Sequence, residues 1–281
     1  MVGPRPQRID LDHLRRMKAA RQKIAMLTAY DFRMAAAAEA AGVHSLLIGD
    51  SMGTVLLGHE STRGTPLSLM VTLGEAVRRG APSVFLIGDL PFECISAGSE
   101  AVLGGARRFL DEAGCDAVKV EVGPGEEDLI AVLARAGIHA VAHLGLRPQQ
   151  VLTPDGYRSQ ARDAASIADL VAQARRMEAA GAAMLLLEAV PNEASQAVVA
   201  ALEVPVIGCG AGPACDGHVL VTEDMLGLGA PRPPRFVPQH AQLGEQVARA
   251  LSQYVEDIAA GRYPGPEHVY HMRGATHAAK P

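Results

Sequence analysis

The sequence is poor in aromatic residues and contains no tryptophan. Aromatic residues make up 4% of the 281 residues, and the formal net charge is −5. A nucleic-acid-binding protein would instead show a basic surface and rings on which bases can stack. We therefore expect no nucleic-acid partner.

Cysteine and long apolar runs are also scarce. The four cysteines show no Cys-x-x-Cys spacing, and a disulfide-stapled secreted domain would be shorter and richer in cysteine. No apolar run approaches the roughly 20 residues of a membrane span. The first 23 residues lack the apolar stretch of a signal peptide. We expect a soluble cytoplasmic protein with no membrane partner.

What the chain does contain is a repeated unit. An Ala-rich helical segment ends at a glycine (proline in the last copy), and a short apolar strand follows within a few residues. The helical segments are 35–42, 68–80, 101–114, 126–137, 165–181 and 193–202, and the strands after them are 44–49, 84–88, 117–120, 139–142, 183–187 and 205–207. Continuous apolar strands are typical of parallel sheets that are covered on both faces.

Two further apolar segments, 24–29 and 219–221, bring the number of expected strands to eight. Strands that alternate with helices indicate βαβ units, and eight such units predict a single (β/α)8 barrel. The rival is an open doubly wound sheet, whose nucleotide fingerprint would be Gly-x-Gly-x-x-Gly after a strand. The turn 208–212 comes close, but Pro213 stands where the last glycine belongs. We leave open whether this turn approaches a ligand or is simply tight.

The domain prediction is one barrel over residues 1–281. Within it, residues 1–23 contain an N-terminal helix, Ile9–Lys23, that either caps the barrel floor or meets a neighbouring subunit. A C-terminal helix is expected over 239–261, and residues 276–281 are expected to form a disordered tail.

Ionisable residues gather at the carboxyl ends of the expected strands. In a parallel barrel these ends open on one face, where the active sites of this fold lie. The residues are Asp50, Asp89, Lys119, Glu121, His143 and Glu188.

A single acid after a strand is more often a helix cap than a ligand. Four acids around one lysine would repel one another without a further cation, and an all-oxygen ligand set favours Mg²⁺. Such a metal could polarise the carbonyl of an oxyacid, and a further carboxylate could remove the adjacent proton. His143 is either a substrate contact or a satisfied core histidine.

These residues fall in motifs that resemble the ketopantoate hydroxymethyltransferase family (3-methyl-2-oxobutanoate hydroxymethyltransferases) of the phosphoenolpyruvate-binding barrel superfamily. The resemblance extends from about Leu27 to Met272. The motifs include Thr28-Ala-Tyr-Asp31, Gly49-Asp-Ser-Met-Gly53, Asp89-Leu-Pro-Phe92, Lys119-Val-Glu121, His143-Leu-Gly-Leu146, Glu188 and Gly210-Ala-Gly-Pro213.

The resemblance implies an Mg²⁺-dependent aldol-type reaction. It transfers the one-carbon unit of 5,10-methylenetetrahydrofolate to 2-oxoisovalerate and gives ketopantoate, a precursor of pantothenate and coenzyme A. The implied metal ligands are Asp50, Asp89 and Glu121, and the implied base is Glu188. The expected substrate contacts are Asp50, Ser51, Asp89, Lys119 and His143. The family also forms homo-oligomers, typically decamers.

The chain departs from the family pattern at six positions: Val122, Ala142, Arg147, Asp155, Ala189 and His218. Most of them are expected beside the pocket, so they bear on the oxo acid and the folate contacts. Two alternatives follow. One is a paralogue that hydroxymethylates another 2-oxo acid, and the other is a C–C or P–C lyase or mutase of the same superfamily.

Overall fold

The structure, a computed structural model, describes residues 8–151, 153, 156–229 and 233–272. Eight parallel strands close into a barrel in chain order, and the first strand pairs with the last. This confirms the predicted (β/α)8 fold class. The strands are β1 (Ile24–Thr28), β2 (Ser45–Ile48), β3 (Phe85–Asp89), β4 (Ala117–Glu121), β5 (Ala140–Gly145), β6 (Met184–Glu188), β7 (Val206–Cys209) and β8 (Gly217–Leu220).

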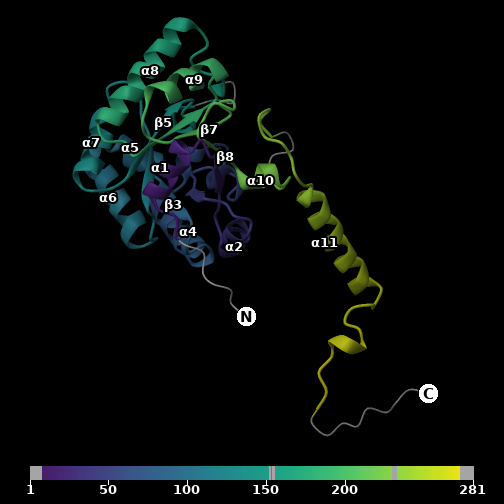
Figure 1. The fold of residues 1–281 in the computed structure, drawn as a ribbon. Helices are drawn as coiled ribbons and strands as arrows, with labels where there is room; N and C mark the ends of the chain where they lie inside the picture. The colour runs from purple at the N-terminus through teal and green to yellow at the C-terminus, as the bar shows by residue number, and fades with distance from the viewer. Residues whose placement is uncertain (1–7, 152, 154–155, 230–232, 273–281) are drawn as a thin grey trace.

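Helices surround most of the barrel (Figure 1). The α-helices are α1 (Leu11–Ala19), α2 (Phe32–Ala40), α3 (Met52–Val55), α4 (Leu67–Gly80), α5 (Phe92–Ser96), α6 (Ser99–Asp111), α7 (Glu127–Arg135), α8 (Ala164–Ala179), α9 (Asn192–Ala201), α10 (Thr222–Met225) and α11 (Leu243–Ala259). The short 3-10 turns among the described residues are η1 (Thr62–Gly64), η2 (Pro148–Gln150) and η4 (Pro266–His268).

The glycines of the repeated unit end the helices as predicted. Gly42, Gly114, Gly137 and Gly181 follow α2, α6, α7 and α8 with φ angles of 83°, 67°, 73° and 102°. Residues with a Cβ atom adopt this left-handed conformation at a cost, which is why glycine commonly stands just after a helix.

The last strand begins earlier than the sequence indicated. We expected residues 219–221, whereas β8 starts at Gly217. A Cβ atom at Gly217 would lie 2.4 Å from the backbone oxygen of Ile24, so only glycine lets β8 approach β1 this closely. Gly217 is therefore part of the closure of the barrel.

Helix α1 closes the amino-terminal end of the barrel. Its buried residues Leu11, Leu14 and Met17 belong to the same apolar cluster as the barrel-interior residues Met26 and Phe85. The sequence left open whether this helix caps the barrel floor or meets a neighbouring subunit, and in the structure it caps the floor.

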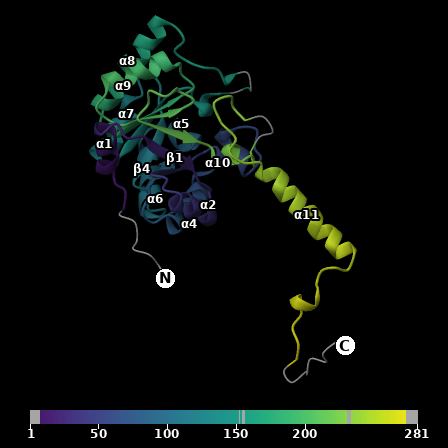
Figure 2. The same cartoon turned by 45° about the vertical axis from the view of Figure 1, so that its right-hand side comes forward.

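Helix α11 behaves differently, because it leaves the barrel and extends away from it (Figures 1 and 2). None of its residues is buried. Its bounds lie inside the expected 239–261, whereas the tail expected at 276–281 falls outside the described residues. No described helix combines the length and apolar character needed to cross a bilayer.

Candidate active site

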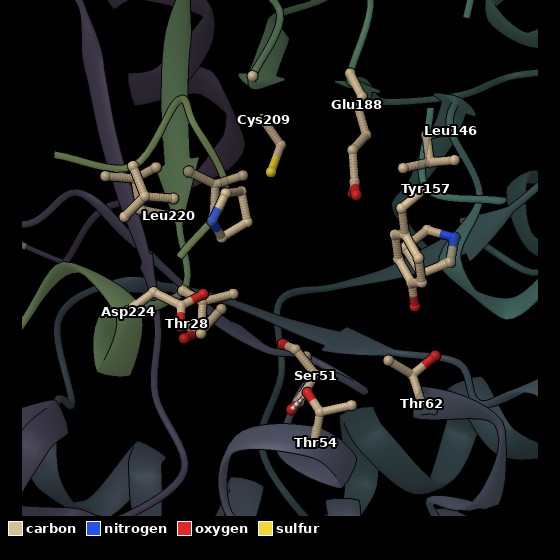
Figure 3. Close-up of a pocket in the computed structure, with 18 of the residues that line it drawn as sticks. Thr28, Ser51, Thr54, Thr62, Leu146, Tyr157, Glu188, Cys209, Leu220 and Asp224 are labelled. Atoms are coloured by element: carbon tan, nitrogen blue, oxygen red, sulfur yellow. Dashed lines mark hydrogen bonds between the residues drawn. The ribbon is translucent and has the colours of Figure 1, made fainter. Parts of the chain in front are cut away.

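The carboxyl ends of the strands open into one cavity of about 1360 Å³. Six of the seven predicted site residues line it: Asp50, Ser51, Asp89, Lys119, His143 and Glu188. Figure 3 shows Glu188 reaching into this cavity from one side and Ser51 lying on the opposite side. Glu121, the seventh, is 2% exposed and lies just outside this lining.

Lys119 lies among the acids. Its Nζ is 2.8 Å from Asp89 Oδ1 and 3.1 Å from His143 Nδ1. Burial disfavours its charge, but the carboxylates of Asp89 and Asp50 outweigh this effect and raise the pKa of Lys119. Lys119 is therefore a permanent cation in the cavity.

Asp50 and Asp89 lie next to each other because β2 and β3 are paired and both carboxylates follow from strand ends. The backbone N–H of Asp50 donates to Asp89 Oδ2 at 3.0 Å. Burial raises the pKa of Asp89 to about 8, with a contribution from the charge of Asp50, although Lys119 opposes the shift. One lysine does not compensate these acids, so a further cation would be accommodated here.

Gln149, on η2, connects two of the acids and was not recognised as a site residue from the sequence. Its side-chain Nε2 donates to Asp50 Oδ2 at 3.0 Å, and its backbone N–H donates to Glu121 Oε2 at 3.1 Å. It is fully buried. The only available signal was its place in the polar turn after β5, which does not reveal where the side chain points.

Glu121 is surrounded by other acids. Burial raises its pKa well above the ordinary value, Lys119 opposes this, and the charges of Asp50 and Asp89 add to it. No group of three ligating side chains that could hold a metal occurs in the part of the chain that the structure describes. The carboxylate oxygens of Asp50 and Asp89 are still hard ligands of the kind that Mg²⁺ prefers. The Glu121 carboxylate accepts a hydrogen bond from the backbone N–H of Gln149.

The side chains of His143 on β5 and Glu188 on β6 approach each other from neighbouring strands. His143 Nδ1 accepts from the Lys119 ammonium, which places the ring proton on Nε2, 3.4 Å from Glu188 Oε2. Burial and the nearby charge of Lys119 lower the pKa of His143 well below its usual value, so the ring is neutral. Burial raises the pKa of Glu188 to about 8.

The Ser51 hydroxyl forms a hydrogen bond with a buried tyrosine, Tyr30, which was also not recognised as a site residue from the sequence. The hydroxyls of Tyr30 and Ser51 are 2.8 Å apart, and Tyr30 is 2% exposed. Since α3 begins directly after Ser51, this contact fixes the hydroxyl at the edge of the cavity, near Thr54 and Thr62 (Figure 3).

The glycine turn after β7 is both tight and close to the cavity. Gly210 lines the cavity and has a φ of 63°, and a Cβ atom there would lie 2.6 Å from the ring of Phe236. Gly212 has a φ of 76° and packs on Asn192. Backbone conformation and packing thus account for both glycines.

The departures from the family pattern lie mostly away from the cavity. Among those that the structure describes, only Ala189 lines it, with a φ of 48° directly after Glu188. Val122 and Ala142 are buried, and Arg147 Nη1 lies 3.6 Å from Glu126 Oε2. Asp155 falls outside the described residues.

A closed parallel barrel that presents acids, a lysine and a histidine together at its carboxyl end has the architecture of a (β/α)8-barrel enzyme. Solved structures share this fold. Phosphoenolpyruvate phosphomutase from Streptomyces platensis subsp. rosaceus aligns with a TM-score of 0.59 at 15% identity, covering 93% of this chain and 92% of that one. A 2,3-dimethylmalate lyase of the PEP mutase/isocitrate lyase superfamily aligns with a TM-score of 0.57 at 18% identity, covering 92% of each chain.

Sequence similarity is more specific. The family model for ketopantoate hydroxymethyltransferase matches residues 8–266. The 3-methyl-2-oxobutanoate hydroxymethyltransferase of Geobacillus kaustophilus is 46% identical over 92% of both chains. That of Bacillus subtilis is 42% identical over 93% of this chain and 94% of its own. The chain belongs to the ketopantoate hydroxymethyltransferase family and is a hydroxymethyltransferase, as the motifs indicated.

Proposed function

We propose that this enzyme transfers the one-carbon unit of 5,10-methylenetetrahydrofolate to 2-oxoisovalerate and produces ketopantoate for pantothenate and coenzyme A synthesis. In the balanced reaction, C3 of the oxo acid loses a proton and bonds to the methylene carbon. Both bonds between that carbon and the two folate nitrogens break, and water supplies the new hydroxyl. The two nitrogens take up the proton from C3 and one proton from the water. Family membership supports this reaction. The four free cysteines fit a reducing compartment such as the cytoplasm.

The observation that carries the proposal is the placement of Glu188. Its carboxylate faces the cavity, 3.4 Å from the neutral ring of His143, and its pKa is raised to about 8. A carboxylate with a pKa this close to neutrality is basic enough to take a carbon-bound proton and weak enough as an acid to hold it. We assign Glu188 as the base that deprotonates C3.

Lys119, Ser51 and His143 bind and orient the oxo acid in this proposal. The Lys119 ammonium pairs with the substrate carboxylate, and the Ser51 hydroxyl, held by Tyr30, donates to a substrate oxygen. The neutral ring of His143, with its Nε2 3.4 Å from Glu188 Oε2, contacts the oxo acid beside the base.

Asp50 and Asp89 are the proposed Mg²⁺ ligands, because the Asp50 backbone N–H donates to the Asp89 carboxylate, which makes the two acids neighbours, and the charge of Lys119 only partly opposes theirs. Glu121 remains the predicted third. When bound, the ion would act as a Lewis acid on the oxo group and make the neighbouring C–H more acidic. Gln149 orients the Asp50 carboxylate through its 3.0 Å hydrogen bond.

Exchange of the C3 hydrogen with solvent tests proton removal by the base independently of the transfer step. Wild-type protein with Mg²⁺ in D₂O, without folate, should exchange the C3 hydrogen of 2-oxoisovalerate, and Glu188→Gln should not. Wild-type exchange in the variant would place the base elsewhere, with His143 as the next candidate.

A substrate panel identifies the oxo acid. A series of 2-oxo acids with methylenetetrahydrofolate and Mg²⁺, followed by mass spectrometry, should give the highest kcat/KM for 2-oxoisovalerate. Preference for another acid would indicate a paralogue, and cleavage of the acid without folate would indicate a lyase.

A further inference from the structure

The active-site cavity is larger than a small 2-oxo acid requires. Its volume of about 1360 Å³ exceeds the roughly 300–1,000 Å³ of an ordinary ligand pocket. Asp50, Lys119 and Glu188, which act on the oxo acid, its cation and its proton, form only part of the lining. The rest of the lining has a different chemistry and is available to a second molecule.

Two pairs of neighbouring residues, each an arginine beside an aromatic residue, line this cavity. They are Tyr157 with Arg158, in the segment after β5, and Arg235 with Phe236, in the segment after β8. Aromatic side chains are scarce in this chain, which has five Tyr, five Phe and no Trp. Tyr157 and Phe236 are nevertheless 48% and 39% exposed. Planar groups of a ligand can stack on such rings, and guanidinium groups pair with carboxylates.

The barrel places the two aromatic residues on either side of Glu188. Strands β5, β6 and β7 are consecutive neighbours in the sheet, and Glu188 ends β6. On the β5 side, Tyr157 lies beside Leu146 and its hydroxyl points into the cavity (Figure 3). On the β7 side, the Phe236 ring packs on the turn after the strand, since a Cβ atom at Gly210 would lie 2.6 Å from it. A ligand that contacted both rings would therefore cross the cavity beside the Glu188 carboxylate.

Both aromatic residues belong to segments that are attached to the barrel. The backbone N–H of Gln160 donates to the carbonyl of Ala189 at 2.9 Å, which joins the segment of Tyr157 to the turn after β6. Val237, the residue after Phe236, is 8% exposed, so its burial anchors the second segment. Rings that are held in place before a ligand arrives lose less conformational entropy when it binds.

We propose that Tyr157 and Phe236 bind the two ring systems of 5,10-methylenetetrahydrofolate, an inference that rests on the reaction proposed above. The co-substrate consists of a pterin ring, an aminobenzoyl ring and a glutamate tail, and its methylene carbon bridges two nitrogens between the rings. With one ring system on each aromatic side chain, this carbon lies beside Glu188, where C3 of the oxo acid loses its proton.

Polar groups on the two sides give the direction of the bound molecule. Asp224, which is 7% exposed, lines the cavity on the β8 side together with Leu220 (Figure 3). A carboxylate suits the adjacent N–H donors on the edge of a pterin, so the pterin belongs on Phe236. The aminobenzoyl ring then lies on Tyr157, and Arg158 pairs with a carboxylate of the glutamate tail.

Calorimetric titration of the full chain with tetrahydrofolate tests the two rings. Phe236→Ala and Tyr157→Ala should each raise the Kd by about 5- to 150-fold, as expected when a ring that stacks on a planar ligand is removed. Tyr157→Phe keeps the ring and should restore binding. Phe32→Ala is the matched control, because it removes a ring that is 44% exposed on α2, outside the cavity lining, and it should keep the wild-type Kd. Circular dichroism checks that each variant is folded.

Tetrahydropteroate, which lacks the glutamate tail, tests the direction. Arg158→Gln should raise the Kd of tetrahydrofolate and leave the Kd of tetrahydropteroate unchanged, whereas Arg235→Gln should affect both ligands equally. A tail-dependent loss of affinity in Arg235→Gln alone would overturn the assigned direction.

Failure of this inference differs from failure of the proposed reaction. A wild-type Kd in folded Phe236→Ala or Tyr157→Ala would overturn the assignment of that ring, while turnover of wild type with methylenetetrahydrofolate would leave the reaction standing. A wild type that neither binds tetrahydrofolate nor turns over with the methylene form would overturn both. Exchange of the C3 hydrogen of 2-oxoisovalerate in D₂O needs no folate, so it separates loss of donor binding from loss of the catalytic site.

Discussion

Glu188→Gln should stabilise the metal-free protein at alkaline pH while abolishing most of its activity. The Glu188 side chain is 18% exposed. The ionisable side chain beside its carboxylate is that of His143, and because this ring is neutral, no cation contacts Glu188. Burial raises the pKa of Glu188 from 4.5 to about 8. Because the folded state holds the proton more tightly than the unfolded chain, stability falls as pH rises between these two values.

The size of the effect follows from the same shift. A change from 4.5 to about 8 corresponds to an upper bound of about 5 kcal/mol at pH above 8. Water that enters the open cavity reduces this, so we expect about 1–3 kcal/mol, as for other unpaired buried charges. Glutamine keeps the shape without the charge. The variant should therefore melt higher than wild type at pH 9 and nearly equal to it at pH 5, where Glu188 is protonated.

Thermal melting of both proteins in chelator, followed by circular dichroism at pH 5, 7 and 9, measures this. Glu100→Gln, at an exposed position, is the matched control and should show the same difference at each pH. In parallel, turnover of Glu188→Gln with Mg²⁺ should fall by roughly 10²–10⁴-fold. A pH-independent difference in melting temperature, or a variant that melts lower at pH 9, would refute the picture of a largely buried carboxylate with no cation in contact.

Three further substitutions test the site. Asp89→Asn should weaken Mg²⁺ affinity in calorimetry while the fold is retained, and unchanged affinity would contradict its role as a ligand. Lys119→Met should lower stability at neutral pH by about 1–3 kcal/mol, because Asp89 loses the hydrogen-bonded ion pair with Lys119 and takes up a proton. It should also raise the KM for the oxo acid, whereas unchanged kinetics in the folded fraction would assign Lys119 a structural role alone. Gly210→Ala should cost about 1–2 kcal/mol in chemical denaturation from strain at its φ of 63°, and wild-type stability would show that the turn relaxes.

The architecture of the barrel could be predicted from local signals. Each glycine after a helix, such as Gly137, indicates a residue in the left-handed backbone conformation. Each continuous apolar strand indicates a strand that is buried on both faces. Because crossovers between parallel strands are right-handed, repetition of the helix–glycine–strand unit is compatible with only a few sheet topologies. The same reasoning places Asp50, Asp89 and Glu188 on one face, because strand ends in a closed parallel barrel share an end.

Contacts between those side chains were decided only by the tertiary structure. The proximity of Lys119 to both Asp89 and His143 depends on the register of three neighbouring strands, which the sequence pattern does not specify. Gln149 reaches Asp50 across 99 residues, a contact with no local signal.

Helix α11 shows the same division between local and long-range information. Its helical spacing was visible in the sequence, so its existence and its apolar face were expected. Its direction depends on backbone contacts between Gly244 and Gly227, which only the folded chain reveals. Periodicity records which face of an element avoids water, whereas the surface that covers that face is set by packing between segments distant in the chain.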